Sequence, residues 1–196
     1  MGLPQANPPH HRYADYLGWP DGVRYELIDG EAYLMAPAPG VRHQTLAGEL
    51  YRQLANALAG SPCKPFAAPL DVRLPHADEA DDKIDSVVQP DVLVVCDPAK
   101  LDERGVRGAP DFIVEVLSPA TAAHDQIRKL ALYERAGVRE YWLVHPVDRV
   151  LAAYRLTDGV YPRPLMQALA GETPVTALPG VVIVWDEATA RLDALP

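Results

Sequence analysis

The stretch that decides the fold is residues 89–129. It opens with QPDVLVV at 89–95, continues after a polar loop with PDFIVEVL at 110–117, and ends in a helical segment that carries Lys129. Both apolar runs have the length of a strand, and each holds an acidic residue. Glu115 lies in the middle of its run, where a buried carboxylate is costly unless a cation or a metal compensates it. This break in the apolar pattern marks Glu115 as the candidate centre of function.

The pairing of these two strands decides whether their acidic residues meet. If the strands run antiparallel with Cys96 opposite Pro110, Asp91 falls directly opposite Glu115. Directly opposed residues project from the same face with Cβ atoms about 5 Å apart, whereas a slip of one residue separates them. Two carboxylates so placed repel each other, and a divalent cation between them relieves both. The assumed register therefore predicts a metal-binding pair.

The segment after the second strand predicts a helix that brings a cation to this pair. Residues 118–119, Ser-Pro, end the strand, and we expect Thr121 to cap a helix that runs to residue 136. Lys129 then lies roughly 12 Å along the helix, and Glu115 lies roughly 7 Å back along its strand. A helix that doubles back over the sheet carries Lys129 past Glu115. The alternative is a solvated i,i+4 pair of Asp125 with Lys129.

The first half of the chain predicts a hairpin and a long helix. Asp29-Gly30 separates two strand-like runs, and this dipeptide favours a type I′ turn. Glu26 and Glu31 flank the turn, each either functional or solvent-facing. Residues 41–59 form a helix whose apolar stripe recurs every four residues, at Leu46, Leu50, Leu54 and Leu58.

Two polar residues of that helix receive different predictions. His43 points near the inner face, either as a hydrogen-bonded structural residue or as a catalyst. Glu49 is expected to be solvated.

The second half of the chain predicts a crossover unit followed by further β structure. A strand at 139–145 follows the helix, so it runs parallel to the strand at 111–117. It pairs back with residues 150–156 as a hairpin, and short β pieces and a closing helix near Asp186 complete the chain. Trp142 and Trp185 are expected to pack in the core or at its edge. The order of elements indicates an α/β fold.

The bulk properties bound the remaining possibilities. We expect residues 1–10 to be a disordered tail and residues 11–196 to form a single domain. The formal net charge of −9 argues against broad nonspecific attraction to nucleic acid. No run approaches the length of a membrane span. Cys63 and Cys96 lie far apart without metal-ligand spacing, which predicts two reduced thiols in a cytoplasmic protein.

One further loop is rich in acidic residues. Residues 76–85 lack the glycine and the terminal glutamate of an EF-hand loop, so we expect a flexible, solvated segment.

Several segments resemble a known family when they are taken together. They are YELIDGE at 25–31, His43-Gln44, QPD at 89–91, VEVLSP at 114–119, Lys129 with Tyr133, and GVREYWLVHP at 137–146. In order and spacing this combination resembles the Uma family of restriction endonucleases, formerly a domain of unknown function. The resemblance covers nearly the whole chain past residue 10. It implies the PD-(D/E)xK nuclease superfamily, with a restriction-endonuclease-like core in which helices flank a central mixed β-sheet, here with an N-terminal β-hairpin and extra C-terminal strands.

The resemblance also implies roles for particular residues. Asp91 resembles the metal-binding aspartate of the family, and Glu115 resembles the second ligand of Mg²⁺ or Mn²⁺. The superfamily places a lysine two residues after this glutamate, but Leu117 stands there. Lys129 resembles the displaced lysine of superfamily variants. Family positions near the cleft are matched by Glu31, His43 and, less closely, Asp71.

The implied function is a metal-dependent endonuclease that cuts phosphodiester bonds in nucleic acid, with DNA as the expected partner and a homodimer as the expected assembly. Three alternatives stay open. Leu117 and the acidic surface favour a catalytically silent scaffold of the same fold that binds protein or nucleic acid. The acidic surface also suits a metal-dependent phosphohydrolase of small nucleotides. Carboxylates about 5 Å apart fit a glycosidase, although aromatic residues for a sugar groove are few.

Overall fold

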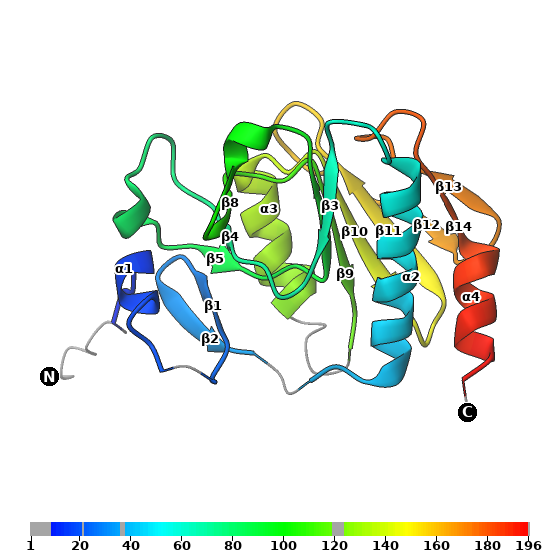
Figure 1. Cartoon of the computed structure of the whole chain (residues 1–196), viewed down its shortest axis with the longest axis horizontal. Helices are drawn as coiled ribbons and strands as arrows, with labels where there is room; N and C mark the ends of the chain where they lie inside the picture. Colours follow the sequence, from blue (N-terminus) through cyan, green and yellow to red (C-terminus); the bar gives the residue numbers. More distant parts are fainter. Residues whose placement is uncertain (1–8, 21, 36–37, 119–123, 196) are drawn as a thin grey trace, which may run out of the picture.

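The computed structural model describes residues 9–20, 22–35, 38–118 and 124–195. A central six-stranded sheet has the order β12-β11-β10-β9-β6-β3 (Figure 1). Its strands β9 and β10 are parallel and its other neighbours are antiparallel, so the sheet is mixed, as predicted. The strands are β12 (Leu165–Ala168), β11 (Val150–Arg155), β10 (Glu140–His145), β9 (Phe112–Val116), β6 (Val92–Val95) and β3 (Lys64–Ala67).

A second six-stranded sheet lies beside the first and has the order β2-β1-β5-β4-β8-β7. Its strands are β2 (Glu31–Leu34), β1 (Tyr25–Ile28), β5 (Val87–Val88), β4 (Val72–Arg73), β8 (Gly105–Arg107) and β7 (Leu101–Asp102). Strands β1 and β2 form the predicted hairpin, in which Ile28 pairs with Glu31. Asp29 and Gly30 both have positive φ, at 50° and 77°, as the primed turn requires.

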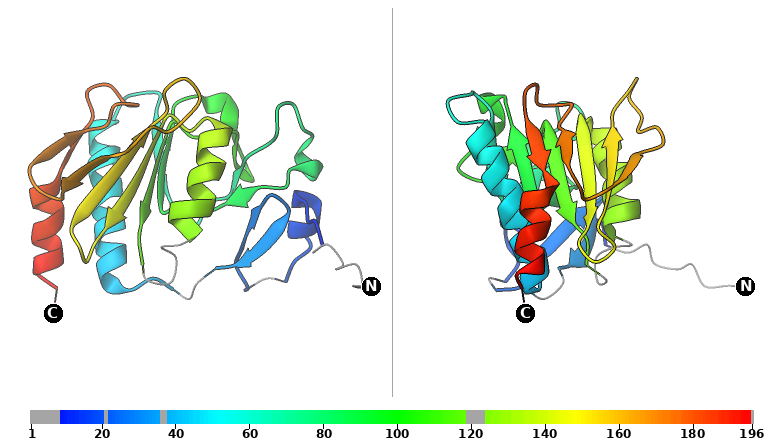
Figure 2. Two further views of the ribbon diagram at one scale, coloured as in Figure 1. Left: turned by 180° about the vertical axis from the view of Figure 1, so that it is seen from behind. Right: turned by 90° about the vertical axis from the view of Figure 1, so that its right-hand side faces the viewer.

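Helices cover both faces of the central sheet. They are α2 (Val41–Ala57), α3 (Leu130–Ala136) and α4 (Trp185–Asp193), whereas α1 (Tyr13–Tyr16) lies away from this sheet and packs against residues 81–83 (Figure 1). Figure 2 shows α2 and α4 together on one face and α3 on the other. A small sheet of β13 (Glu172–Pro174) and β14 (Val182–Val184) leads into α4. Within the described ranges, no helix combines the length and apolar character that crossing a membrane requires.

The alternation of strand residues builds two cores on the two faces of the central sheet. The buried leucines of α2 pack on the even-numbered residues of β6 and β9, which include Val92, Val94, Phe112 and Val114. Odd-numbered residues such as Leu93, Ile113 and Leu117 join the core beneath α3. The rings of Trp142 and Trp185 are buried with centroids 5.9 Å apart, so of the two expected placements, core or edge, both tryptophans take the core.

Cys63 and Cys96 form a disulfide, so the prediction of two reduced thiols is wrong. The cause is the register of β3 on β6. Lys64 pairs with Val95, and one further step along this antiparallel register sets Cys63 opposite Cys96. The sequence separates the two cysteines by 33 residues and does not reveal that β3 lies beside β6.

Glu49 is buried, so the prediction that it is solvated is also wrong. Helix α4 packs against α2 and brings Arg191 to this carboxylate, with Nε 2.6 Å from Glu49 Oε2. Arg52 and Gln53 donate to its other oxygen from the same helix. Three donors therefore compensate the burial of the charge.

The acidic loop is held against the protein at some of its residues, while most of its side chains are exposed, as expected of a solvated segment. The buried Arg73 guanidinium lies 2.5 Å from Asp81 and 2.6 Å from Asp102. Ile84 of the same loop is fully buried. Asp81–Lys83 forms a 3₁₀ turn, and its Asp81 is one of the carboxylate partners that the buried arginine requires.

The predicted disordered tail, residues 1–10, can be compared with the structure only at its last two residues. Residues 1–8 of the predicted tail lie outside the described residues. His10 packs against the acidic loop, with Nε2 3.3 Å from Asp85.

Candidate active site

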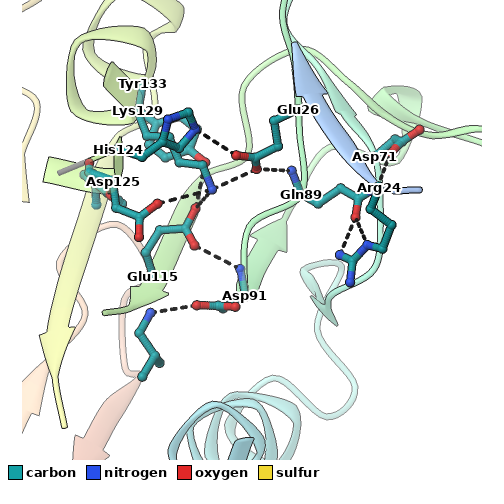
Figure 3. A network of polar contacts seen from close by, with 12 residues as sticks. Arg24, Glu26, Asp71, Gln89, Asp91, Glu115, His124, Asp125, Lys129 and Tyr133 are labelled. Atoms are coloured by element: carbon teal, nitrogen blue, oxygen red, sulfur yellow. Dashed lines mark hydrogen bonds and ion pairs between the residues drawn. The ribbon is translucent and has the colours of Figure 1, made fainter. Parts of the chain in front are cut away.

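The two central acidic residues face each other across β6 and β9. Val92 pairs with Val114 and Leu93 with Ile113, so Asp91, one residue before β6, is opposite Glu115. This is the register that the sequence analysis assumed. The backbone N–H of Asp91 donates to Glu115 Oε2 over 3.3 Å (Figure 3). The N–H of Val116 donates to Asp91 Oδ2 over 2.8 Å, and this bond orients the aspartate.

Lys129 reaches this pair from the segment that enters α3. Its Nζ is buried and lies 2.9 Å from Glu115 Oε1, which confirms that the segment doubles back over the sheet. Asp125 lies 3.5 Å from the same nitrogen. Both residues of this i,i+4 pair are buried, so the solvated alternative is wrong. They belong to a π-helical turn, His124–Lys129, a rare geometry often found at functional sites. The predicted cap Thr121 lies outside the described residues.

Glu26 completes the cluster, although its place in the sequence left open whether it is functional or solvent-facing. It is buried in β1, and its Oε1 lies 2.8 Å from Lys129 Nζ while its Oε2 lies 3.0 Å from His124 Nε2. Burial alone would raise the pKa of Glu26, but the Lys129 charge and hydrogen bonds from His124 and Gln89 hold it at about 2. The missed signal was the one that identified Glu115, since Glu26 also interrupts a strand of otherwise buried residues.

The cluster contains more negative than positive charge. Among the described residues, the carboxylates of Glu26, Glu115 and Asp125 surround the ammonium group of Lys129, and Asp91 adjoins Glu115 through its backbone N–H. Burial raises the pKa of Glu115 well above its ordinary value; Lys129 opposes this rise, and the three other carboxylates add to it. Carboxylate oxygens are the ligands that Mg²⁺ prefers, and an added divalent cation would relieve the repulsion. The donor set at Asp91 and Glu115 therefore fits such an ion.

His43 is brought to the cluster from the first turn of α2. Its Nε2 lies 3.1 Å from Asp91 Oδ2, and its side chain is 12% exposed. Burial alone would lower the pKa of His43, but the hydrogen bond and the charge of Asp91 raise it above its ordinary value. The imidazole therefore faces the aspartate through Nε2, and its Nδ1 is buried without a hydrogen-bond partner among the described residues.

Three other residues that the sequence points to, Glu31, Leu117 and Asp71, lie outside this cluster. Glu31 is exposed beside the hairpin turn and accepts a hydrogen bond from Tyr33, so the structure does not bring it into the cluster. Leu117 is buried in the core beneath α3 and provides no charge. Asp71 accepts a hydrogen bond from Gln89 Nε2 over 2.7 Å. Because the backbone of Gln89 donates to Glu26, Asp71 is linked to the cluster through one residue.

A second group of potential metal ligands lies on the hairpin turn and the acidic loop. Ligand atoms of Asp29, His76 and Asp85 lie within 4.8 Å of one another. Asp29 and His76 are exposed, and Arg135 already pairs with Asp29. This group shares no residue with the pair of Asp91 and Glu115.

Comparisons with known proteins identify the family of the chain and a solved structure of the same fold. The chain matches the Uma2 family model, described as "Putative restriction endonuclease", over residues 13–186. An uncharacterized protein of Synechocystis is 28% identical over 158 residues, which is 79% of each chain. A crystal structure described as a "putative nuclease belonging to DUF820" from Anabaena variabilis shares the fold, with a TM-score of 0.74 and 17% identity over 93% of this chain and 99% of that one. Because the family model spans residues 13–186 of 196, the protein belongs to the Uma2 family of restriction-endonuclease-like proteins.

Proposed function

We propose that the protein is a metal-dependent endonuclease that hydrolyses phosphodiester bonds in nucleic acid at the cluster of Asp91, Glu115 and Lys129. One observation carries the proposal: a buried lysine is hydrogen-bonded to a glutamate that lies directly opposite an aspartate. A structural ion pair would need only one carboxylate for one lysine. The excess of buried carboxylates has its simplest physical reason in a further cation. Membership of the Uma2 family supports a reaction on nucleic acid.

Asp91 and Glu115 are the residues that would hold Mg²⁺ or Mn²⁺. When bound, the ion polarises a phosphoryl oxygen and lowers the pKa of a bound water. Asp91 is fixed for this role by hydrogen bonds from Val116 and His43 to its Oδ2. Glu115 is fixed by Tyr133, whose hydroxyl donates to Oε1 over 3.0 Å. Both carboxylates are thus oriented before substrate arrives.

Lys129 and His43 would act on the substrate from opposite ends of the carboxylate pair. Lys129 keeps its charge because Glu26 and Glu115 lie within hydrogen-bond distance of its Nζ. A positioned ammonium group stabilises the negative charge that develops on the phosphate in the transition state. His43, beside Asp91, is placed to contact a phosphate or to accept a proton. Lys129 would replace the lysine that is absent at Leu117.

We further propose DNA as the substrate and a homodimer as the active assembly. The support for both is indirect. Restriction endonucleases act on DNA, and cutting both strands of a duplex commonly uses two sites. With a net charge of −9, binding would depend on the local cleft rather than on a basic surface.

A cleavage assay tests the proposal. Plasmid DNA, single-stranded DNA, RNA and a small nucleotide are incubated with Mg²⁺, with Mn²⁺ and with EDTA. Asp91→Asn, Glu115→Gln and Lys129→Met are each expected to lose on the order of 10²–10³-fold in rate, because each removes a ligand or a charge that acts in the transition state. Cleavage of the small nucleotide alone would point to a phosphohydrolase.

The matched control is Glu103→Gln, which removes an exposed carboxylate between β7 and β8 and should leave the rate unchanged. Calorimetric titration of Mn²⁺ should show binding to the wild type that disappears in Asp91→Ala/Glu115→Ala. Full cleavage activity in Asp91→Asn, or cleavage that persists in EDTA, would refute the proposal.

A further inference from the structure

A cavity of 270 Å³ opens directly beside the proposed reaction centre. Asp91 and His43 form part of its wall, so a molecule inside it would adjoin the carboxylate pair. The rest of the wall comes from α2, from the loop after β3, and from both ends of the hairpin. The lining of the cavity includes Arg24, Gln44, Gly48, Tyr51 and Gln89.

Gly48 is the first sign that this space is kept open. It lies in the middle of the 17-residue helix α2, where glycine is destabilising relative to alanine. A Cβ added at Gly48 would meet no atom within 4 Å, and its φ is not in the left-handed region. Neither packing nor backbone conformation therefore requires glycine here. Gly48 is exposed and lines both this cavity and a second hollow beside Arg52 and Arg191. An occupant of the cavity would account for the glycine, because a large side chain here would take up part of the space that it lines.

The chemistry of the wall suits an unpaired nucleotide. Tyr51, which is 37% exposed, offers an aromatic ring, and bases stack on such rings whatever their sequence. Arg24 provides a guanidinium group for a phosphate or for a base face, and Gln89 Oε1 orients it by accepting from Nε over 3.0 Å and from Nη2 over 2.5 Å. Gln44 adds an amide that can pair with a base edge.

Size and charge separate an unpaired strand from a duplex. The cavity is near the lower end of the range for ligand pockets, about 300–1,000 Å³, so it admits one nucleotide and no stacked base pair. A protein with a net charge of −9 gains little from nonspecific attraction to the dense charge of a duplex. Stacking of an exposed base supplies affinity that does not depend on net charge.

We propose that this cavity binds one unpaired nucleotide of the substrate strand next to the scissile phosphate, so that the protein acts on single-stranded or locally unpaired nucleic acid. The proposal rests on the proposed function and narrows its substrate class. Tyr51 stacks on the base, Arg24 contacts the strand, and Gly48 leaves room for the nucleotide along α2.

The experiment measures strand binding without cleavage. The probe is a fluorescein-labelled oligothymidylate of about twelve nucleotides, free or annealed to its complement, and fluorescence anisotropy is recorded in EDTA. The single strand should bind at least roughly tenfold more tightly than the duplex. Gly48→Phe fills the cavity and Tyr51→Ala removes the stacking ring, and each should weaken single-strand binding about tenfold. Gly48→Ala, with its single methyl group, should cause a much smaller loss.

Ala57→Phe is the matched control, because it adds the same ring to an exposed position of the same helix that does not line the cavity. Its dissociation constant should stay within about twofold of the wild type. Equal affinity for single strand and duplex overturns the proposal. The proposal is also overturned if Gly48→Phe binds the single strand as tightly as Ala57→Phe does. If Gly48→Phe fails to fold, the exposed Tyr51 decides the outcome through Tyr51→Ala.

A cleavage assay in Mg²⁺ keeps the two proposals distinguishable. Cavity-dependent binding of the single strand without cleavage would refute the endonuclease and leave the nucleotide site intact. Cleavage of duplex that is unaffected by Gly48→Phe would refute the nucleotide site alone.

Discussion

At the scale of single residues, the cluster depends on one buried charge. Lys129 lies within 3.5 Å of three carboxylates, those of Glu26, Glu115 and Asp125. Breaking a buried ion pair leaves uncompensated charge and typically costs about 3–5 kcal/mol. Lys129→Met should therefore lower the free energy of unfolding by about this amount, measured by urea denaturation at pH 7. Lys83→Met removes an exposed lysine as a control, and its effect should stay within about 0.5 kcal/mol.

A double-mutant cycle extends this prediction to Glu26, whose place in the sequence left open whether it is functional or solvent-facing. Glu26→Gln should cost less stability in Lys129→Met than in the wild type, because its charge has already lost its partner. Residues in direct contact within one network couple by about 0.5–3 kcal/mol. Additive effects of the two substitutions would show that Glu26 does not hold Lys129, whatever their distance.

At the scale of one element, one glycine inside helix α2 and one just after it test which backbone conformation requires glycine. Gly48 has helical φ and Gly60, just after the helix, has φ +79°, yet an added Cβ would meet nothing within 4 Å at either position. Gly48→Ala should stabilise the protein by about 0.5–1 kcal/mol, because alanine favours a helix interior. Gly60→Ala should destabilise it by about 1 kcal/mol, because the left-handed region strains a side chain.

Chemical denaturation of both variants measures whether Gly48→Ala raises the free energy of unfolding and Gly60→Ala lowers it. A destabilising Gly48→Ala would mean that the structural role of Gly48 lies in the helix itself. The proposal of a nucleotide site in the cavity would then lose its strongest support, because the helix itself would explain the glycine.

At the scale of the whole molecule, the disulfide ties the edge strand β3 to β6 and closes a loop between residues separated by 33 positions. In the chain-entropy account, a crosslink of this span contributes about 3–4 kcal/mol. A thiol reductant should therefore lower the free energy of unfolding of the wild type by up to this amount. Cys63→Ser/Cys96→Ser should be insensitive to reductant and match the reduced wild type. Two titratable thiols in the untreated native protein would contradict the prediction.

Much of the framework of the site followed from local pattern. The antiparallel register that was assumed for the two apolar runs is the one observed for β6 and β9, and it sets Asp91 opposite Glu115. The spacing of the following segment predicted that Lys129 passes Glu115. These contacts join segments that are close in sequence, where strand and helix periods fix the geometry. The catalytic roles of these residues remain predictions, and that of Glu31 has no contact in the cluster to support it.

The sequence by itself determined the elements and their periodicity, because hydrophobic alternation and turn chemistry are properties of neighbouring residues. Only the tertiary structure decided which partners the buried carboxylates and the two cysteines meet. Glu26 meets Lys129, Glu49 meets Arg191, and Cys63 meets Cys96 through contacts between distant segments. A carboxylate reads the same in sequence whether it is solvated or buried. Its desolvation is offset only by whatever the fold brings next to it.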